Sequence, residues 1–109
     1  MWLSLLFNML PTVLGAIPGI SPKIKGIITD VTTGGAAVIA SGVTTGPSVN
    51  TILAAWMGVI NVLKADPNLP KNTIGAIAEL EKAVSAALMN DVQASQLVDW
   101  SKVITIATV

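Results

Sequence analysis

The first twenty residues, MWLSLLFNMLPTVLGAIPGI, contain no charged side chain. Small and polar residues recur within them at spacings of four, four and three, at Ser4, Asn8, Thr12 and Gly15. These spacings place the four residues on one narrow stripe of a helix, and apolar residues cover the rest of its surface. A helix of this kind is buried against protein or against lipid. The sequence therefore predicts an apolar N-terminal helix over residues 1–17.

A second helix is predicted to begin at Pro22, because Ser21 is a favourable N-cap and proline suits the first helical position. Isoleucine and valine residues then recur at helical spacing. Two adjacent glycines, Gly34 and Gly35, leave two alternatives open: the helix ends there, or it continues to Ala40. The stretch that follows, GVTTGPSVN, is expected to be a loop.

Two further helices are predicted in residues 48–66 and 71–91, separated by DPNLP, whose prolines end the first of them. In the second of these helices, five apolar residues are expected to face inward: Ile74, Ile77, Leu80, Val84 and Leu88. Three polar residues are expected to face solvent: Glu79, Lys82 and Ser85. Asn72 or Thr73 is the expected N-cap.

The C-terminal end of the chain has a different pattern. Residues 91–102 are compatible with a last short helix, whereas VITIATV, residues 103–109, consists mostly of β-branched residues. Such a run favours an extended strand over a helix. Because a lone strand has no partner in a helical domain, residues 98–109 are predicted to form an extended arm. This arm would dock on a neighbouring subunit or along the helices of its own chain.

A shift of 49 residues aligns the first half of the chain with the second. Six residues then meet identical residues: Val13, Leu14, Ala16, Pro18, Gly26 and Ile28 lie over Val62, Leu63, Ala65, Pro67, Gly75 and Ile77. Two origins are open, a duplicated helical hairpin or chance matches from biased composition and a common helix-proline-helix layout. A duplication would give two hairpins packed as a four-helix unit. In either case we expect an all-α fold, a single domain over residues 1–109 with four to five helices.

Composition narrows the possible functions. Apolar residues make up 52% of the 109 residues and charged residues 11%, against a usual charged share of about 25%. A small domain has a large surface for its volume, so these few charges cannot cover it and much of the outside is expected to meet protein or lipid. The cations are six lysines, and the net charge is zero. No nucleic-acid partner is therefore expected.

No catalytic, metal or cofactor site is predicted. The chain has no histidine and no cysteine, which removes the usual acid–base group near neutral pH, thiolate metal ligands and the familiar serine and cysteine triads. Glu79 and Glu81 are two residues apart, which points them away from each other on a helix. The turns TTGG and TTGPS lack the spacing and the lysine of a phosphate-binding loop. Neither an enzyme nor a small-molecule substrate is expected.

Two functions remain as hypotheses. The one we favour is a non-enzymatic structural or assembly protein, a small apolar helical subunit that self-associates or packs against other protein subunits, as in a virus or phage particle. The alternative is a small membrane-active protein of the holin or pore-forming type, or a subunit of a membrane complex. Against it, glycine-containing turns interrupt the charge-free stretch from Val31 to Leu63, so no run of about 20 apolar residues is left. A cleaved signal peptide is not expected, because the chain begins without a basic residue.

The residues expected to contact a neighbouring subunit lie in three parts of the chain. In the N-terminal segment they are Trp2, Leu6, Phe7 and Leu10. In the third predicted helix, Gly58 lies on a stripe of small residues where another helix could approach closely. In the C-terminal segment they are Trp100, Val103, Ile104, Ile106 and Val109.

Overall fold

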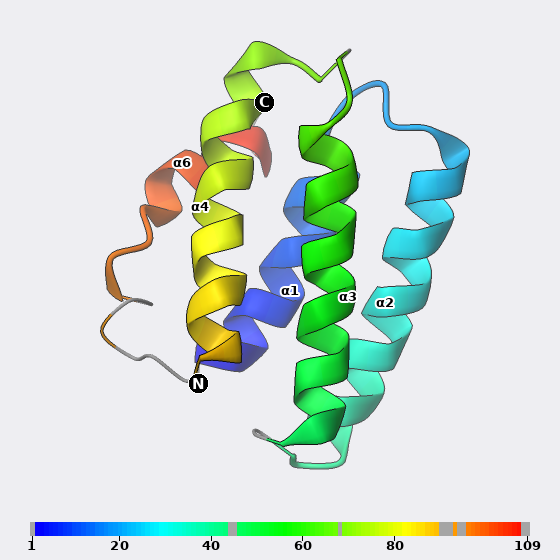
Figure 1. Ribbon diagram of the computed structural model, residues 1–109, viewed down its shortest axis with the longest axis vertical. Helices are drawn as coiled ribbons and strands as arrows, with labels where there is room; N and C mark the ends of the chain where they lie inside the picture. The colour runs from blue at the N-terminus through cyan, green and yellow to red at the C-terminus, as the bar shows by residue number, and fades with distance from the viewer. Residues whose placement is uncertain (1, 44–45, 68, 90–92, 94–95, 108–109) are drawn as a thin grey trace.

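The computed structural model describes residues 2–43, 46–67, 69–89, 93 and 96–107. Within these ranges the chain forms α-helices joined by turns, and no residue is in a strand. The all-α prediction is therefore confirmed. The helices are α1 (Trp2–Gly15), α2 (Pro22–Ala40), α3 (Pro47–Lys64), α4 (Lys71–Leu88) and α6 (Trp100–Ala107) (Figure 1).

Helix α2 begins where the sequence predicts and takes the longer of its two alternatives. Its N-cap is Ser21, whose Oγ accepts a hydrogen bond from the backbone N–H of Ile24 at 3.3 Å, and Pro22 is its first residue. The helix continues through the two glycines to Ala40. A cap with a side-chain acceptor, followed by proline, satisfies the start of the helix without any tertiary contact.

The glycine pair in α2 allows close packing against two neighbouring helices. A Cβ atom at Gly34 would lie 2.9 Å from Cδ1 of Ile52 in α3, and one at Gly35 would lie 3.2 Å from Cδ2 of Phe7 in α1. Both distances are shorter than ordinary van der Waals contact between carbon atoms. The glycines therefore make room for neighbours, and they do not end the helix.

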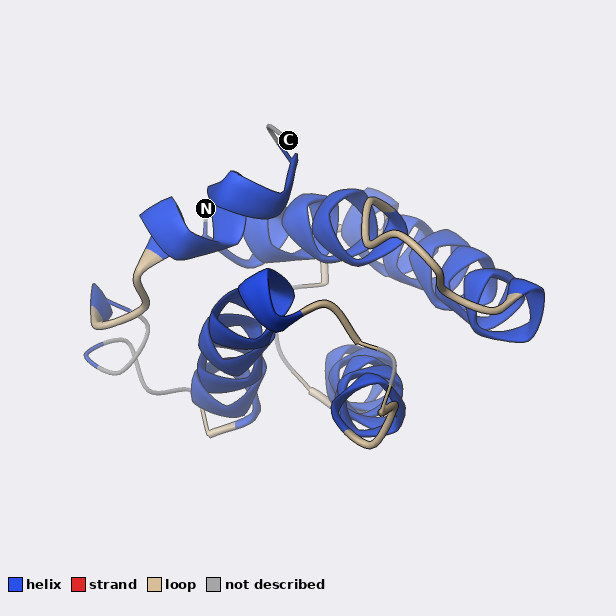
Figure 2. Ribbon diagram, turned by 90° about the horizontal axis from the view of Figure 1, so that it is seen from above, coloured by secondary structure: helices blue, strands red, loops and turns tan. Residues whose placement is uncertain are grey.

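The first four helices form a closed ring of contacts. Helix α1 packs against α2, α2 against α3, α3 against α4, and α4 against α1, while α6 packs on α4 and α1. Figure 1 shows α3 and α4 at the front with α1 behind them, and Figure 2 shows from above that the helices lie in two layers. Large, fully buried side chains fill the space between the layers: Trp56, Leu6, Leu10, Leu14, Leu53, Ile60, Leu63, Ile77 and Leu80.

The helix boundaries follow the 49-residue shift seen in the sequence. The shift carries Gly15, the last residue of α1, onto Lys64, the last residue of α3. It also carries Pro22, the first residue of α2, onto Lys71, the first residue of α4. Under the same shift the packed pair α2–α3 corresponds to the packed pair α4–α1. The bundle is thus two helical hairpins with matching boundaries, and we call positions 49 residues apart equivalent.

The extended C-terminal arm predicted for residues 98–109 is wrong as far as Ala107, because residues 100–107 form α6. The residue before the helix caps it: a carboxylate oxygen of Asp99 accepts a hydrogen bond from the backbone N–H of Ser101 at 3.1 Å. Val103 is fully buried on the bundle. Burial of one helical face outweighs the weak preference of β-branched residues for strands. Thr108 and Val109 lie outside the described residues.

The predicted inward face of α4 is confirmed at Ile77, Leu80 and Val84, which are buried, and is wrong at its flanks. Ile74, expected inside, is 54% exposed, and Glu79, expected outside, is only 6% exposed. The predicted cap is also wrong: α4 starts after Pro70 without a side-chain cap, and Thr73 instead donates from Oγ1 to the Pro70 carbonyl oxygen at 2.6 Å. The side chain of Asn72 lies outside the described part of the structure. The burial of Glu79 has a tertiary cause, since its carboxylate bonds to Asp99, the residue before α6, and α6 packs on α4.

Candidate functional site

An apolar groove of about 350 Å³ runs between α2 and α3. Its lining consists of apolar residues and one glycine: Ile24, Ile27, Val31, Ala55, Gly58, Val59 and Val62. Two of the larger side chains remain open to solvent, since Ile27 is 41% exposed and Val62 is 52% exposed. Isolated exposed apolar residues are common on protein surfaces, whereas a contiguous apolar hollow indicates a contact surface.

Helical spacing builds each wall of this groove. On α2, Ile24, Ile27 and Val31 follow one another at intervals of three and four residues, which places them on one face. On α3, residues 55, 58, 59 and 62 share a face in the same way. Gly58 contributes no side chain to the groove, and a Cβ atom there would meet no other atom within 4 Å. The small residue therefore leaves a hollow between the larger side chains of the two walls.

Most of the predicted interface residues that the structure describes are buried inside the chain. Leu6, Leu10 and Val103 are fully buried, and Phe7 is also in the core. Their apolar character is explained by packing inside one chain, so these four residues present no surface to a neighbour in this fold. Trp100 is half-buried and packs against the same core.

Gly58 alone among the described predicted interface residues lies in an open apolar hollow. The expected close packing at this glycine does not occur within the chain, since the position faces open space. The side chains of Trp2, Ile104 and Ile106, and all of Val109, lie outside the described part of the structure. Sequence reasoning missed Ile27 and Val62 as surface residues. The sequence pattern that could have identified them is their place at the edge of an apolar stripe. Burial at such an edge depends on which neighbouring element covers the helix.

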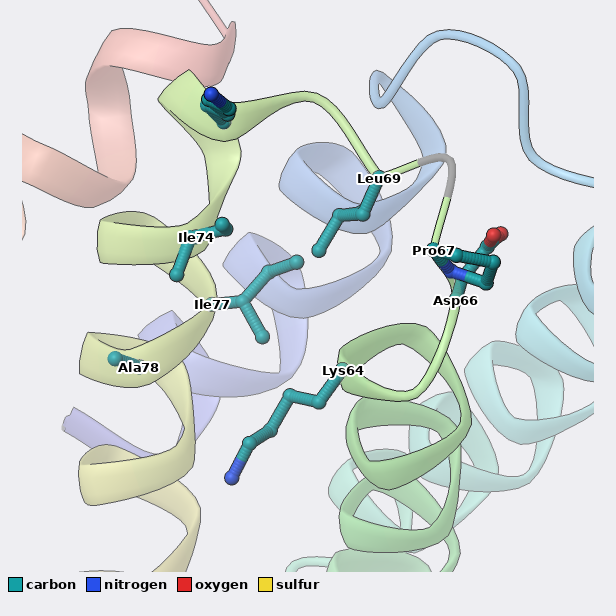
Figure 3. Close-up of a pocket in the computed structure, with 8 residues that line it drawn as sticks. Lys64, Asp66, Pro67, Leu69, Ile74, Ile77 and Ala78 are labelled. Atoms are coloured by element: carbon teal, nitrogen blue, oxygen red, sulfur yellow. The ribbon is translucent and has the colours of Figure 1, made fainter.

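A second hollow, of about 330 Å³, lies between the end of α3 and the first turns of α4 (Figure 3). Figure 3 shows Leu69 and Ile77 reaching toward each other across it, while the carboxylate of Asp66 points away from Ile77. The ammonium group of Lys64 is paired with Oε2 of Glu81 at 2.7 Å. The hollow therefore combines apolar side chains with three charged residues in its lining, Lys64, Asp66 and Lys71.

The most buried carboxylate among the described residues, Glu79, holds two elements together. Its Oε2 accepts a hydrogen bond from the backbone N–H of Asp99 at 3.1 Å, and its Oε1 accepts one from Nζ of Lys82 at 3.0 Å. The bond from Asp99, and next the bond from Lys82, lower the pKa of Glu79. Hydrogen bonds from the hydroxyl and the backbone of Ser101 likewise lower the pKa of Asp99. Carboxylates stabilised as anions in this way are poor proton donors.

Metal-binding clusters and membrane-spanning helices are both missing from the described ranges. No cluster of three or more carboxylates there could hold a metal ion. Within the same ranges, no helix combines the length and the apolar character needed to cross a membrane. The α2–α3 groove has a lining without any polar or charged side chain.

Comparisons with protein-family models, with curated proteins and with solved structures find no match to this chain. What the chain binds is therefore inferred from its own surface.

Proposed function

We propose that this chain is a non-enzymatic assembly protein, a small helical subunit that packs against other copies of itself through the α2–α3 groove. The observation that carries the proposal is the groove itself, with Ile27 and Val62 exposed on its two walls. Fully burying a valine or isoleucine side chain is worth about 1.5–3 kcal/mol. Covering these half-exposed side chains together with the hollow at Gly58 would therefore favour association.

The charge distribution supports the same proposal. The chain has six basic and six acidic residues and a net charge of zero, so two copies would approach without net repulsion. None of the residues that line the groove is charged. Burying this surface would therefore leave no unpaired charge in the interface. A charge that is buried in a contact without a partner is strongly destabilising.

The proposal is tested by the absolute mass of the untagged protein, measured by light scattering on a sizing column without detergent. We expect a discrete multiple of 11.2 kDa that falls to the monomer mass in a chain carrying both Ile27→Lys and Val62→Lys. The matched control is Ile74→Lys, because Ile74 is equally exposed but lies outside the groove. A wild-type mass of one chain, or an oligomer that the double variant leaves intact, would contradict the proposal.

A further inference from the structure

Several positions in α2 and α3 are more exposed than their equivalents in α4 and α1. Val13 in α1 is fully buried, whereas its equivalent in α3, Val62, is 52% exposed. Ala76 in α4 is 2% exposed, whereas its equivalent in α2, Ile27, is 41% exposed. By contrast, positions that face the centre of the bundle are buried in both hairpins, as at Leu14 and Leu63.

The position of helix α6 offers a physical reason for this difference. It packs on α4 and α1, the helices in which the extra buried positions lie. The equivalent pair of helices is α2 and α3, and the groove lies between them. Every residue that lines the groove has its equivalent on the α4–α1 side: Thr73, Ala76, Leu80, Leu6, Met9, Leu10 and Val13. Six of these seven are buried, and Met9 is half-buried. By the 49-residue shift, the groove is therefore the counterpart of the α4–α1 face on which α6 packs. We call these two equivalent faces seats.

The charged groups beside the two seats also correspond. In the occupied seat, Glu79 accepts a hydrogen bond from the backbone N–H of Asp99, which immediately precedes α6. The equivalent position in α2 is Asp30, an exposed carboxylate three residues from Ile27. The N-terminus of a helix carries partial positive charge and unpaired N–H groups, so a carboxylate beside it is favourable. Asp30 would therefore offer an incoming helix the acceptor that Glu79 offers α6.

We propose that the α2–α3 groove binds an amphipathic helix of a second copy of this chain, one with the apolar pattern of α6 and with its N-terminus next to Asp30. In the sequence of α6 this pattern is Trp100, Val103, Ile104 and Ala107, which follow the i, i+3, i+4, i+7 spacing of a helix that docks in a groove. The inference rests on the proposed function in one respect, that the α2–α3 face is a binding surface. It goes beyond it by specifying what is bound.

The test uses the one helix already seen in such a seat. A fluorescein-labelled peptide of residues 96–109 is titrated with the full-length chain, and binding is followed by fluorescence anisotropy. We expect saturable binding at one peptide per chain. In the full-length chain with Ile27→Lys and Val62→Lys, affinity is expected to fall at least about tenfold, because a lysine charge would enter an apolar seat. Ile74→Lys is the matched control and should bind as wild type, and circular dichroism checks that each variant keeps its helix content.

Two additional variants test which face of the peptide helix enters the groove and in which direction the helix lies. A peptide carrying Val103→Asp should lose binding, because its apolar face is interrupted. In the full-length chain, Asp30→Asn should weaken binding about two- to fivefold at low salt, as expected for a carboxylate at a helix N-terminus. An Asp30→Asn chain with unchanged affinity would overturn the proposed direction of the helix.

Absence of binding, or binding that the groove double variant leaves unchanged, would overturn the proposal. In the second case the peptide would be exchanging with α6 on α4 and α1. The mass measurement distinguishes this failure from that of the proposed function. A chain that forms a groove-dependent oligomer but does not bind the peptide loses the helix proposal and keeps the assembly proposal. A monomeric chain that binds the peptide gives the reverse result.

Discussion

The carboxylate of Glu79, in the middle of α4, accepts a hydrogen bond from the backbone N–H of Asp99 at 3.1 Å. Asp99 is the residue that caps α6, so this bond fixes the start of α6 to the bundle. The same carboxylate is paired with Lys82 at 3.0 Å, one turn along α4. A glutamate is rarely this buried unless both its charge and its oxygens have partners.

Replacing Glu79 with alanine should loosen α6. The Asp99 N–H would lose its charged acceptor, and hydrogen bonds to charged groups are worth about 1.5–3 kcal/mol. We expect the free energy of unfolding in urea to fall by about that amount. Hydrogen exchange at the backbone amides of residues 99–103 should accelerate more than exchange in α2 and α3.

The control for this change is Glu81→Ala, which removes the exposed pair between Glu81 and Lys64. Exposed ion pairs contribute about 0–1 kcal/mol, so this variant should stay close to wild type. Equal losses in the two variants, or unchanged exchange near Asp99 in Glu79→Ala, would show that Glu79 does not hold α6.

Acid should weaken the attachment of α6 through the same carboxylate. The pKa of Glu79 is lower in the folded chain than its ordinary value of 4.5, so its contribution to stability is complete above that ordinary pKa. The contribution is lost as the pH falls below 4.5 and through the lowered pKa of the folded state. We expect the urea midpoint to decrease over this range. The decrease should be smaller in Glu79→Gln, and an identical slope in the two proteins would contradict the assignment.

The local features of the fold could be predicted from sequence because each depends on residues close together in the chain. Ser21 and Pro22 start α2, and DPNLP separates α3 from α4, through short-range backbone chemistry. The 49-residue shift left open whether the chain contains two related hairpins, and the matching helix boundaries agree with that alternative. Such signals specify where helices begin and end, and they leave open which flank of a helix another element will cover.

Predictions that depended on long-range contacts failed because local patterns do not specify which flank of a helix another element covers. Glu79 was assigned to the solvent side of α4 because the element that covers it, α6, lies far along the sequence. The β-branched C-terminal segment was expected to be extended, but its docking as a helix buries Val103. The groove was missed in part because Ile27 and Val62 have the same apolar character as core residues. Their exposure follows from the absence of an α6-like helix on their side of the described bundle.

The helical glycines should respond to alanine in opposite directions. A Cβ atom at Gly75 in α4 would meet nothing within 4 Å, whereas one at Gly35 in α2 would lie 3.2 Å from the ring of Phe7. Alanine is favoured over glycine in a helix by about 0.5–1 kcal/mol, so Gly75→Ala should stabilise the chain by that amount. Gly35→Ala should destabilise it by about 1 kcal/mol, because the steric cost of overpacking the core exceeds the stability gained from the helix preference of alanine.

Both glycine variants are compared by urea denaturation under the same conditions. Helix preference is common to the two positions, so the difference between them isolates the packing around Phe7. If Gly35→Ala were as stabilising as Gly75→Ala, the close approach of α2 to α1 would be wrong.

The equivalent valines offer the most direct stability test of the two-hairpin arrangement. Val13 is fully buried in α1, one of the two helices on which α6 packs, and Val62 is 52% exposed in the groove. Val13→Ala should therefore lower the free energy of unfolding by about 1–3 kcal/mol, through lost apolar burial and the cavity left behind. Val62→Ala should change it by no more than about 0.5 kcal/mol, as surface substitutions usually do.

The pair is informative because residue type, helix position and substitution are the same, so helix preference contributes equally to both variants. Only the cover differs. The measurement is the unfolding free energy of each variant at a protein concentration where the chain is monomeric, since association through the groove would add a contribution at Val62. Similar losses in the two variants under these conditions would mean that Val62 is covered within the chain, and the α2–α3 groove would not be an open seat.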